Sequence, residues 1–342
     1  MKEINILRFL FVIGVVLYHS EISFSAADNT LLDVSSTNVY NFLVSHNFLF
    51  DISLLGLFFL SGYLYTIGKD FDYIGYKCKM DRRVKSLLSP FITWNIIWLV
   101  YTFAKNLFLT SKGLPVDVEL STPSQIIQCF WAVNQGVLPN FPIAGYTWFI
   151  RDLFIFALVA PAYMWILDNK PLCYLLTFVS IVLVSYKVML PFFNGALFLG
   201  CLLGKKSVSL SKYVEKIPWW LCMLSTIITL CGYYLTNKNP IFYTLMFVSL
   251  FASLYKISLI LQNYPAIVKF ASFSTFLYLS HVLVLNFLRH LLLKTIAPSC
   301  DSEITFVYYT SFFAAILICY ITFFILQKMN NRILSIMFTG GR

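Results

Sequence analysis

Long apolar runs recur along the whole chain, and they constrain its fold more than any other feature. A helix needs about 20 mostly apolar residues to cross a bilayer. Segments that approach this pattern lie near residues 4–24, 47–67, 86–108, 147–167, 172–190, 192–204, 218–236, 240–262, 270–290 and 304–326. The sequence therefore predicts an all-α fold, a polytopic membrane bundle of about ten transmembrane helices.

The chain also lacks the polar residues with which a protein in water covers its surface. Only 12% of its residues are charged and 59% are hydrophobic, whereas an average soluble domain carries about 25% charged residues. A chain with this composition has much of its surface facing lipid. We therefore expect residues 1–342 to form a single integral membrane domain, without a separate soluble domain.

The basic residues fall in short clusters between the apolar runs, so the net charge of +10 does not indicate nucleic-acid binding. Cytoplasmic loops carry an excess of Lys and Arg. One set of alternating loops holds sixteen of them: Lys2, Lys69, Lys77, Lys79, Arg82, Arg83, Lys85, Lys170, Lys205, Lys206, Lys212, Lys216, Lys269, Lys328, Arg332 and Arg342. The opposite set holds six: Lys105, Lys112, Lys187, Lys238, Arg289 and Lys294. The sequence therefore predicts a multi-pass protein of the cell (inner or plasma) membrane with both termini cytoplasmic.

The eight cysteines are scattered along the chain and form no CxxC pair. Most of them lie within apolar runs, where a cysteine packs as a small hydrophobic residue. The sequence therefore predicts neither a disulfide framework nor a metal site.

Some ionisable residues lie within the apolar runs, namely Arg8, His19, Asp51, Arg151, Asp152 and His281. Such a residue at mid-bilayer costs at least ~2.5–3.5 kcal/mol on insertion scales, which makes each one a candidate functional residue. Structural interpretations are open for three of them. Arg151 and Asp152 fit an interfacial pair near the outer end of the fourth span, and Asp51 fits a solvated residue at a membrane edge.

Arg8 and His19 form the most informative pair. Eleven residues separate them, so on one helix they lie within about 20° of the same face and ~16 Å apart along the axis. The structural interpretation is that a neighbouring helix satisfies each polar group separately. The functional interpretation is a conduit with a cationic anchor near the cytoplasm and a base in the outer half of the membrane.

A basic run, residues 77–85, leads directly into the third apolar run. Such a run can be a topology signal or a contact with anionic lipids. Together with Arg8, which is predicted on the same side, it could instead form a phosphate-binding mouth, because guanidinium groups match phosphate oxygens bidentately.

These residues belong to six short motifs that occur in a fixed order. They are Arg8 with His19, Phe58 to Tyr63, Arg82 to Pro90, Thr147 to Leu153, Gly195 with Gly200, and Ser274 to His281. This order resembles acyltransferase family 3, membrane enzymes that acylate sugars of bacterial surface and exported polysaccharides. The resemblance covers most of the chain.

The resemblance implies roles for particular residues. His19 would be the catalytic group, and the acyl-coenzyme A donor would be engaged by Arg8, Arg82, Arg83 and Lys85. Lys85 stands where the family frequently has Arg. Supporting roles, structural or in the site, would fall to Ser61, Trp148, Arg151, Tyr278 and His281. The donor would be acetyl-coenzyme A by default, and the acceptor a carbohydrate hydroxyl.

A hydroxyl group that attacks a thioester must lose its proton, and a neutral imidazole is a suitable base. We therefore expect His19 to act as a general base, either in direct transfer or by way of an acyl-histidine. His281 is the second choice for the base. The main alternative is a transporter or flippase that uses buried His, Arg and Asp residues, and a membrane scaffold is a third possibility.

Overall fold

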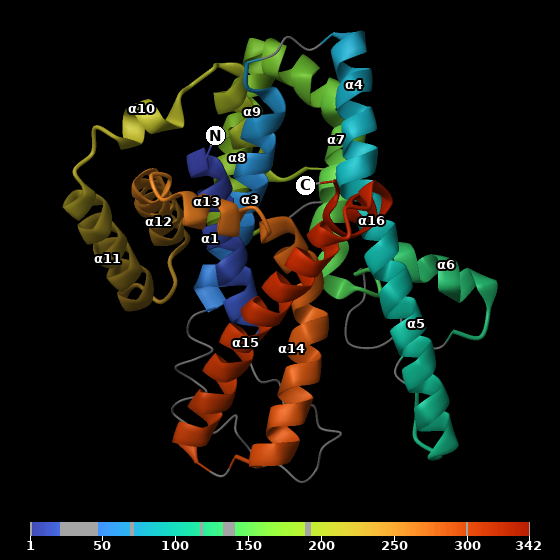
Figure 1. The fold of residues 1–342 in the computed structure, drawn as a ribbon. Coiled ribbons are helices and arrows are strands. Elements are labelled where there is room, and N and C mark those ends of the chain that lie inside the picture. The colour runs from blue at the N-terminus through green and yellow to red at the C-terminus, as the bar shows by residue number, and fades with distance from the viewer. Residues whose placement is uncertain are drawn as a thin grey trace. The chain divides into compact units, whose positions relative to one another are not determined.

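The computed structural model describes residues 2–20, 47–68, 72–116, 118, 120–132, 141–188, 193–298 and 300–341. Every regular element within these ranges is a helix, which confirms the all-α prediction (Figure 1). The ends of three predicted spans, residues 21–24, 189–190 and 192, lie outside the described part of the chain. The chain divides into two compact units, one formed by Met1–Phe71 with Pro161–Thr322 and the other by Asp72–Ala160 with Phe323–Arg342.

Within the described ranges, six helical segments are long and apolar enough to cross a membrane: Phe48–Thr66, Tyr73–Ser111, Gly145–Asp168, Pro240–Leu261, Ser274–Ile296 and Asp301–Lys328. Three shorter apolar helices, Lys170–Ser185, Gly195–Lys205 and Trp219–Leu235, overlap the fifth, sixth and seventh predicted spans. The chain is therefore a multi-pass membrane protein. The total of ten spans and the cytoplasmic termini stay predictions.

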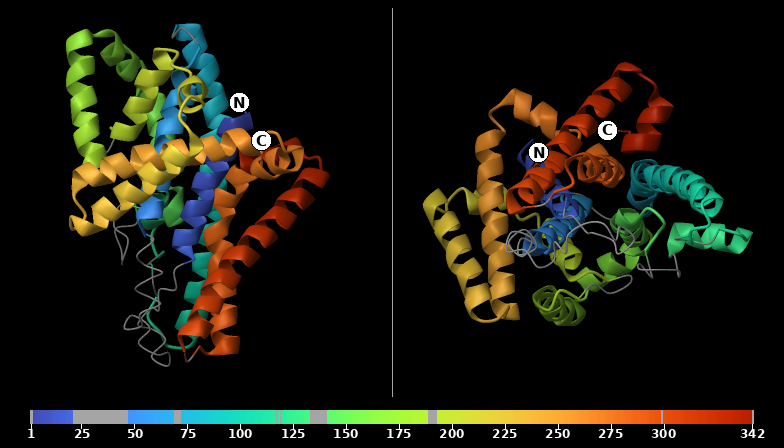
Figure 2. Two further views of the ribbon diagram at one scale, coloured as in Figure 1. Left: turned by 90° about the vertical axis from the view of Figure 1, so that its left-hand side faces the viewer. Right: turned by 90° about the horizontal axis from the view of Figure 1, so that it is seen from below.

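The first unit contains most of the helices. They are α1 (Lys2–His19), α3 (Asn47–Thr66), α8 (Lys170–Ser185), α9 (Gly195–Lys205), α10 (Leu210–Val214), α11 (Trp219–Leu235), α12 (Pro240–Leu261), α13 (Pro265–Ala271), α14 (Ser274–Ile296) and most of α15 (Asp301–Lys328). Figures 1 and 2 show α11 and α12 as an antiparallel pair. Hydroxyl groups link this pair, because Thr226 bonds to Ser253 and Thr229 to Ser249, both at 2.9 Å. Such side chains join helices in a membrane, where apolar contacts alone do not distinguish a helix from lipid.

Helices α3 and α9 cross with their backbones almost in contact. A Cβ atom on Gly200 would lie 2.1 Å from the carbonyl oxygen of Phe59, and one on Gly62 would lie 2.2 Å from that of Leu197. Gly200 and Gly204 form a G-x-x-x-G pattern, which lets two membrane helices approach closely. The crossing therefore explains why glycines stand at these places in the second and fifth sequence motifs.

Helices α1 and α3 run antiparallel. Gly14 packs against Ser53, and Gly56 packs against the ring of Phe11, so the numbering rises along one helix as it falls along the other. The C-terminal end of α1, which carries His19, is thus held beside the N-terminal end of α3.

The second unit contains α4 (Tyr73–Arg83), the π-helical turn η2 (Val84–Leu88), α5 (Ser89–Ser111), α6 (Pro123–Trp131), the 3₁₀ turn η3 (Gly145–Thr147), the first part of α7 (Trp148–Asp168), and α16 (Arg332–Thr339). From Tyr73 to Ser111 the helix is continuous over 39 residues. At 1.5 Å per residue this is ~58 Å, well beyond the ~30 Å hydrocarbon core of a bilayer. The basic run therefore lies in a helix that continues past the apolar span.

Candidate active site

Two histidines that are far apart in sequence meet in the first unit. The ring of His19, the last residue of α1, lies 5.2 Å from the ring of His281 on α14, measured between centroids, with 49° between the planes. Rings at this separation are in van der Waals contact. The sequence predicted His19 as the base and His281 as a supporting residue, and the structure brings the two together.

The proton of His281 can be placed from its partners. Its Nδ1 lies 2.8 Å from the carbonyl oxygen of Tyr278 and 3.0 Å from that of Leu277. Because a carbonyl oxygen only accepts hydrogen bonds, Nδ1 carries the proton and donates it. In the neutral ring, Nε2 then presents a lone pair. His281 is fully buried, so this orientation is fixed by packing as well.

His19 lies in a group of aromatic side chains. The ring of Phe50, at the start of α3, makes a T-shaped contact with His19 at 5.6 Å. Phe50 also stacks on Tyr18 at 4.1 Å. Unlike His281, His19 is only partly buried. Of the two histidines, His19 is therefore the more exposed.

Helix α15 holds the end of α1 in place. The Tyr308 hydroxyl donates a hydrogen bond of 2.9 Å to the carbonyl oxygen of Leu17, two residues before His19. The same carbonyl oxygen also accepts from the backbone N–H of Ser20 at 3.2 Å. The Tyr308 bond therefore adds a partner from another helix at the end of α1.

Tyr308→Phe removes this bond and keeps the packing of the ring. We expect the free energy of unfolding to fall by about 1 kcal/mol, and kcat to fall several-fold because His19 is less well held. The KM for the donor should not change. Tyr309→Phe, at the neighbouring exposed position, is the control, and equal kinetics for the two variants would contradict this role for Tyr308.

The face of α1 between Arg8 and His19 does not form the predicted conduit. The residues on this face are Val12 and Val15, which are 2% and 1% exposed. Helix α1 is continuous, so Arg8 and His19 do share a side, but packed side chains fill the space between them. The prediction of an open passage along this face is wrong for this conformation, because tight helix packing in the first unit covers it.

Ser61 lies away from the histidines. It is eleven residues after Phe50 on α3, or ~16 Å along the helix axis. Its hydroxyl donates to the carbonyl oxygen of Leu57 at 2.7 Å, within its own helix. The neighbouring Gly62 makes the close contact with α9. These contacts favour the structural role for Ser61 over the role in the site.

Arg82, Arg83 and Lys85 lie in the second unit, where α4 passes into the π-helical turn η2. Arg82 and Lys85 are exposed, and Arg83 is half-buried. Helix α16 packs against this turn through Gly340, whose φ of +74° favours glycine and whose added Cβ would lie 2.7 Å from the Ser86 carbonyl oxygen. The turn that presents the three cations is thus supported by the C-terminal end of the chain.

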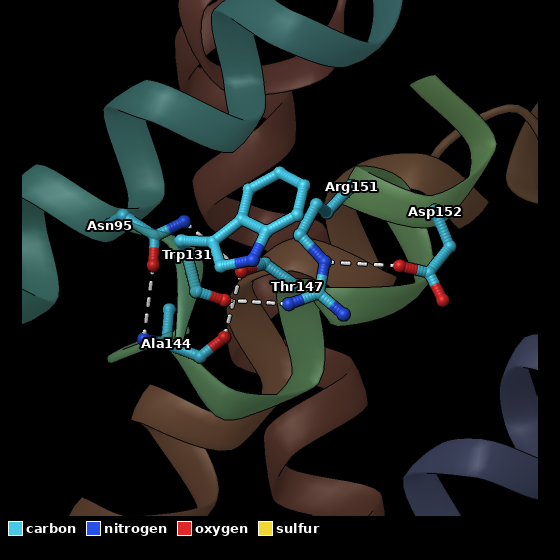
Figure 3. Close-up of polar contacts among 6 residues, drawn as sticks. All are labelled: Asn95, Trp131, Ala144, Thr147, Arg151 and Asp152. Atoms are coloured by element: carbon cyan, nitrogen blue, oxygen red, sulfur yellow. Dashed lines mark hydrogen bonds and ion pairs between the residues drawn. The ribbon is translucent and has the colours of Figure 1, made fainter. Parts of the chain in front are cut away.

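Arg151 serves mainly to join α7 to α6 (Figure 3). Its Nε pairs with Asp152 at 3.0 Å, and its Nη1 donates to the carbonyl oxygen of Trp131 at 2.6 Å. Its guanidinium also lies 5.2 Å from the Trp131 ring centroid. The ion pair between Arg151 and Asp152 is therefore present, whereas its position at a membrane interface stays a prediction. The ring of Trp148 contacts Phe141 at 6.0 Å.

The same region is fixed by a buried amide. Asn95 on α5 donates to the hydroxyl of Thr147 at 3.0 Å and accepts from the Ala144 backbone N–H at 3.1 Å (Figure 3). Both Asn95 and Thr147 are fully buried. Sequence reasoning missed Asn95, although a polar amide inside an apolar run is a signal that could have identified it.

Asp51 forms an ion pair, which the sequence did not predict. Its Oδ2 lies 2.7 Å from Nζ of Lys187, just after α8. The interpretation of Asp51 as merely solvated is therefore wrong.

Among the residues that the structure describes, no group of three or more His, Cys, Asp or Glu side chains is arranged to hold a metal ion.

Comparison with known proteins gives one result. A protein-family model described as an acyltransferase domain matches residues 1–334. No curated protein and no solved structure matches the chain.

Proposed function

The chain belongs to acyltransferase family 3, and from this premise we propose that it transfers an acyl group from acyl-coenzyme A to a hydroxyl of a carbohydrate at the cell membrane. The proposed acyl group is acetyl. Family membership favours an enzyme over the transporter, flippase and scaffold interpretations. The observation that supports the chemistry is the contact between a partly exposed His19 and a buried His281 of defined tautomer.

In the proposed reaction the acceptor oxygen attacks the thioester carbonyl. His19 takes the hydroxyl proton as the new C–O bond forms, which is general base catalysis. The C–S bond then breaks, and the coenzyme A thiolate leaves with the proton that His19 had taken up, which returns His19 to its neutral form. The products are the acylated sugar and free coenzyme A.

His281 is proposed to support His19 rather than to touch the substrate. When His19 takes a proton it becomes a cation, and a neutral imidazole against it can accept a hydrogen bond through Nε2. The backbone carbonyls of Leu277 and Tyr278 hold Nδ1–H, so Nε2 is the acceptor nitrogen of the neutral ring. Tyr278 is thereby proposed to act through its backbone carbonyl.

Arg82, Arg83 and Lys85 are proposed to bind the phosphate groups of the donor. Guanidinium groups form paired hydrogen bonds with phosphate oxygens, whereas a lysine acts as a point charge. Arg82 and Arg83 end α4, and Lys85 follows in η2. The continuous helix extends beyond the apolar span, so it can present these cations to a charged, soluble molecule. Arg8, on the helix that carries His19, is proposed as a further donor ligand on the strength of its sequence motif.

Arg82→Gln and Arg83→Gln test donor binding. Loss of one charged hydrogen-bond partner costs roughly 1.5–3 kcal/mol, so each change should raise the KM for acetyl-coenzyme A by about tenfold or more. Release of coenzyme A by the purified protein in lipid nanodiscs measures this. Lys112→Gln, an exposed cation just beyond α5, is the control. Unchanged donor KM in both Arg variants would refute the proposed role.

A further inference from the structure

A second polar cluster lies close to the histidine pair and has no part in the chemistry proposed above. Nζ of Lys187 bonds to Oδ2 of Asp51 at 2.7 Å and lies 4.5 Å from the ring centroid of Tyr243. It also lies 5.6 Å from the ring of Tyr233. Both tyrosines are buried, whereas the Asp51 and Lys187 side chains are about one-third exposed. An accessible ion pair thus lies over two buried aromatic rings.

The cluster lies at the same end of the first unit as His19. Asp51 directly follows Phe50, whose ring contacts His19. Tyr243 is in the first turn of α12, and Lys187 follows the last residue of α8 by two positions. A molecule bound at the ion pair would therefore be near the base.

The polar groups of the cluster have unused hydrogen-bonding capacity. Among the described residues, the Tyr243 hydroxyl has no hydrogen-bond partner, although this residue is only 1% exposed. Asp51 is engaged through one carboxylate oxygen, and the ammonium group of Lys187 has three hydrogens, of which Asp51 and Tyr233 engage two. Buried polar groups are normally hydrogen-bonded, so an unmatched hydroxyl beside an accessible ion pair requires an explanation.

We propose that Asp51, Lys187 and Tyr243 recognise the acceptor, and that they bind neighbouring hydroxyl groups of a neutral sugar ring. This inference rests on the proposed function. A carboxylate accepts hydrogen bonds from hydroxyls, whereas an ammonium group and a phenol donate to their oxygens. The pair carries no net charge, so it favours a neutral polyol over an anionic sugar.

The test measures binding separately from catalysis. Methyl α-D-glucopyranoside, methyl α-D-galactopyranoside and methyl α-D-mannopyranoside are titrated against the protein in nanodiscs by saturation-transfer NMR, with 1-propanol as the single-hydroxyl control. The variants are Asp51→Asn, Lys187→Gln and Tyr243→Phe. Tyr243→Phe removes only an oxygen that has no partner among the described residues. We therefore expect this variant to fold as the wild-type protein does. Lys205→Gln removes a matched ion pair with Asp168 elsewhere in the first unit.

We expect the wild-type protein to bind at least one glycoside in preference to 1-propanol. Tyr243→Phe and Asp51→Asn should weaken that affinity by about tenfold, and Lys205→Gln should leave it unchanged. Unchanged affinity in Tyr243→Phe and in the folded charge variants, or failure of the wild-type protein to bind all three glycosides, would overturn the proposal. A different result would overturn the proposed function instead: the glycosides bind and the binding depends on these residues, but the protein releases no coenzyme A from acetyl-coenzyme A.

Discussion

His19→Gln is expected to lower kcat for acyl transfer by about 10²–10⁴-fold while the protein folds and inserts normally. Glutamine has a similar length and can form hydrogen bonds, but its amide does not accept a proton at neutral pH. The KM for acetyl-coenzyme A should change little, because the proposed donor ligands are other residues. Stopped-flow or discontinuous measurement of coenzyme A release gives both constants.

The matched control for this variant is His290→Gln, which changes an exposed histidine on the same helix as His281. It should retain wild-type activity. His281→Gln should lower kcat less than His19→Gln does, since it removes a supporting group and leaves the base. Wild-type kcat in His19→Gln, with folding verified by size-exclusion chromatography, would rule out His19 as the base.

Gly200→Ala is expected to abolish the native packing of the first unit. The added Cβ would meet the Phe59 carbonyl oxygen at 2.1 Å and the Tyr63 backbone nitrogen at 3.0 Å. Backbone atoms in a helix cannot move aside as a side chain can, so α3 and α9 must separate. We expect a loss of at least about 3 kcal/mol, the upper range for overpacking, and little monodisperse protein.

Gly232→Ala provides the comparison for this prediction. Its Cβ would lie equally close to a neighbour, 2.2 Å from Cε1 of Phe242, but that neighbour is a side chain. The Phe242 ring can rotate, so this variant should unfold near the wild-type temperature. The measurement is the thermal unfolding of both variants in the same lipid. Similar unfolding temperatures for the two would show that the α3–α9 contact is not rigid.

The helical fold was predictable because apolar runs of this length indicate helices that cross a bilayer. The ordered motifs likewise identified the family, and they predicted His19 and His281 as site residues. Contacts between distant residues could not be read in this way. The pairing of His19 with His281 depends on how α1 packs against α14, and the pairing of Asp51 with Lys187 depends on α3 and α8.

The predicted conduit shows where helical periodicity alone is insufficient. Periodicity placed Arg8 and His19 on one side of α1, and the continuous helix agrees. It could not show that Val12 and Val15, on the same side, are packed against other helices. The π-helical turn after Arg83 was also not predictable, because its support by α16 comes from the far end of the chain.

The central claim, that this protein acylates a glycan hydroxyl, is tested most directly on cellular glycans. Mass spectrometry would compare surface glycans from cells that lack the protein, cells that express it, and cells that express His19→Gln. The account predicts an ester-linked acyl group, removed by mild base, only with the wild-type protein. Identical glycans in all three samples, with the protein present in the membrane, would contradict it.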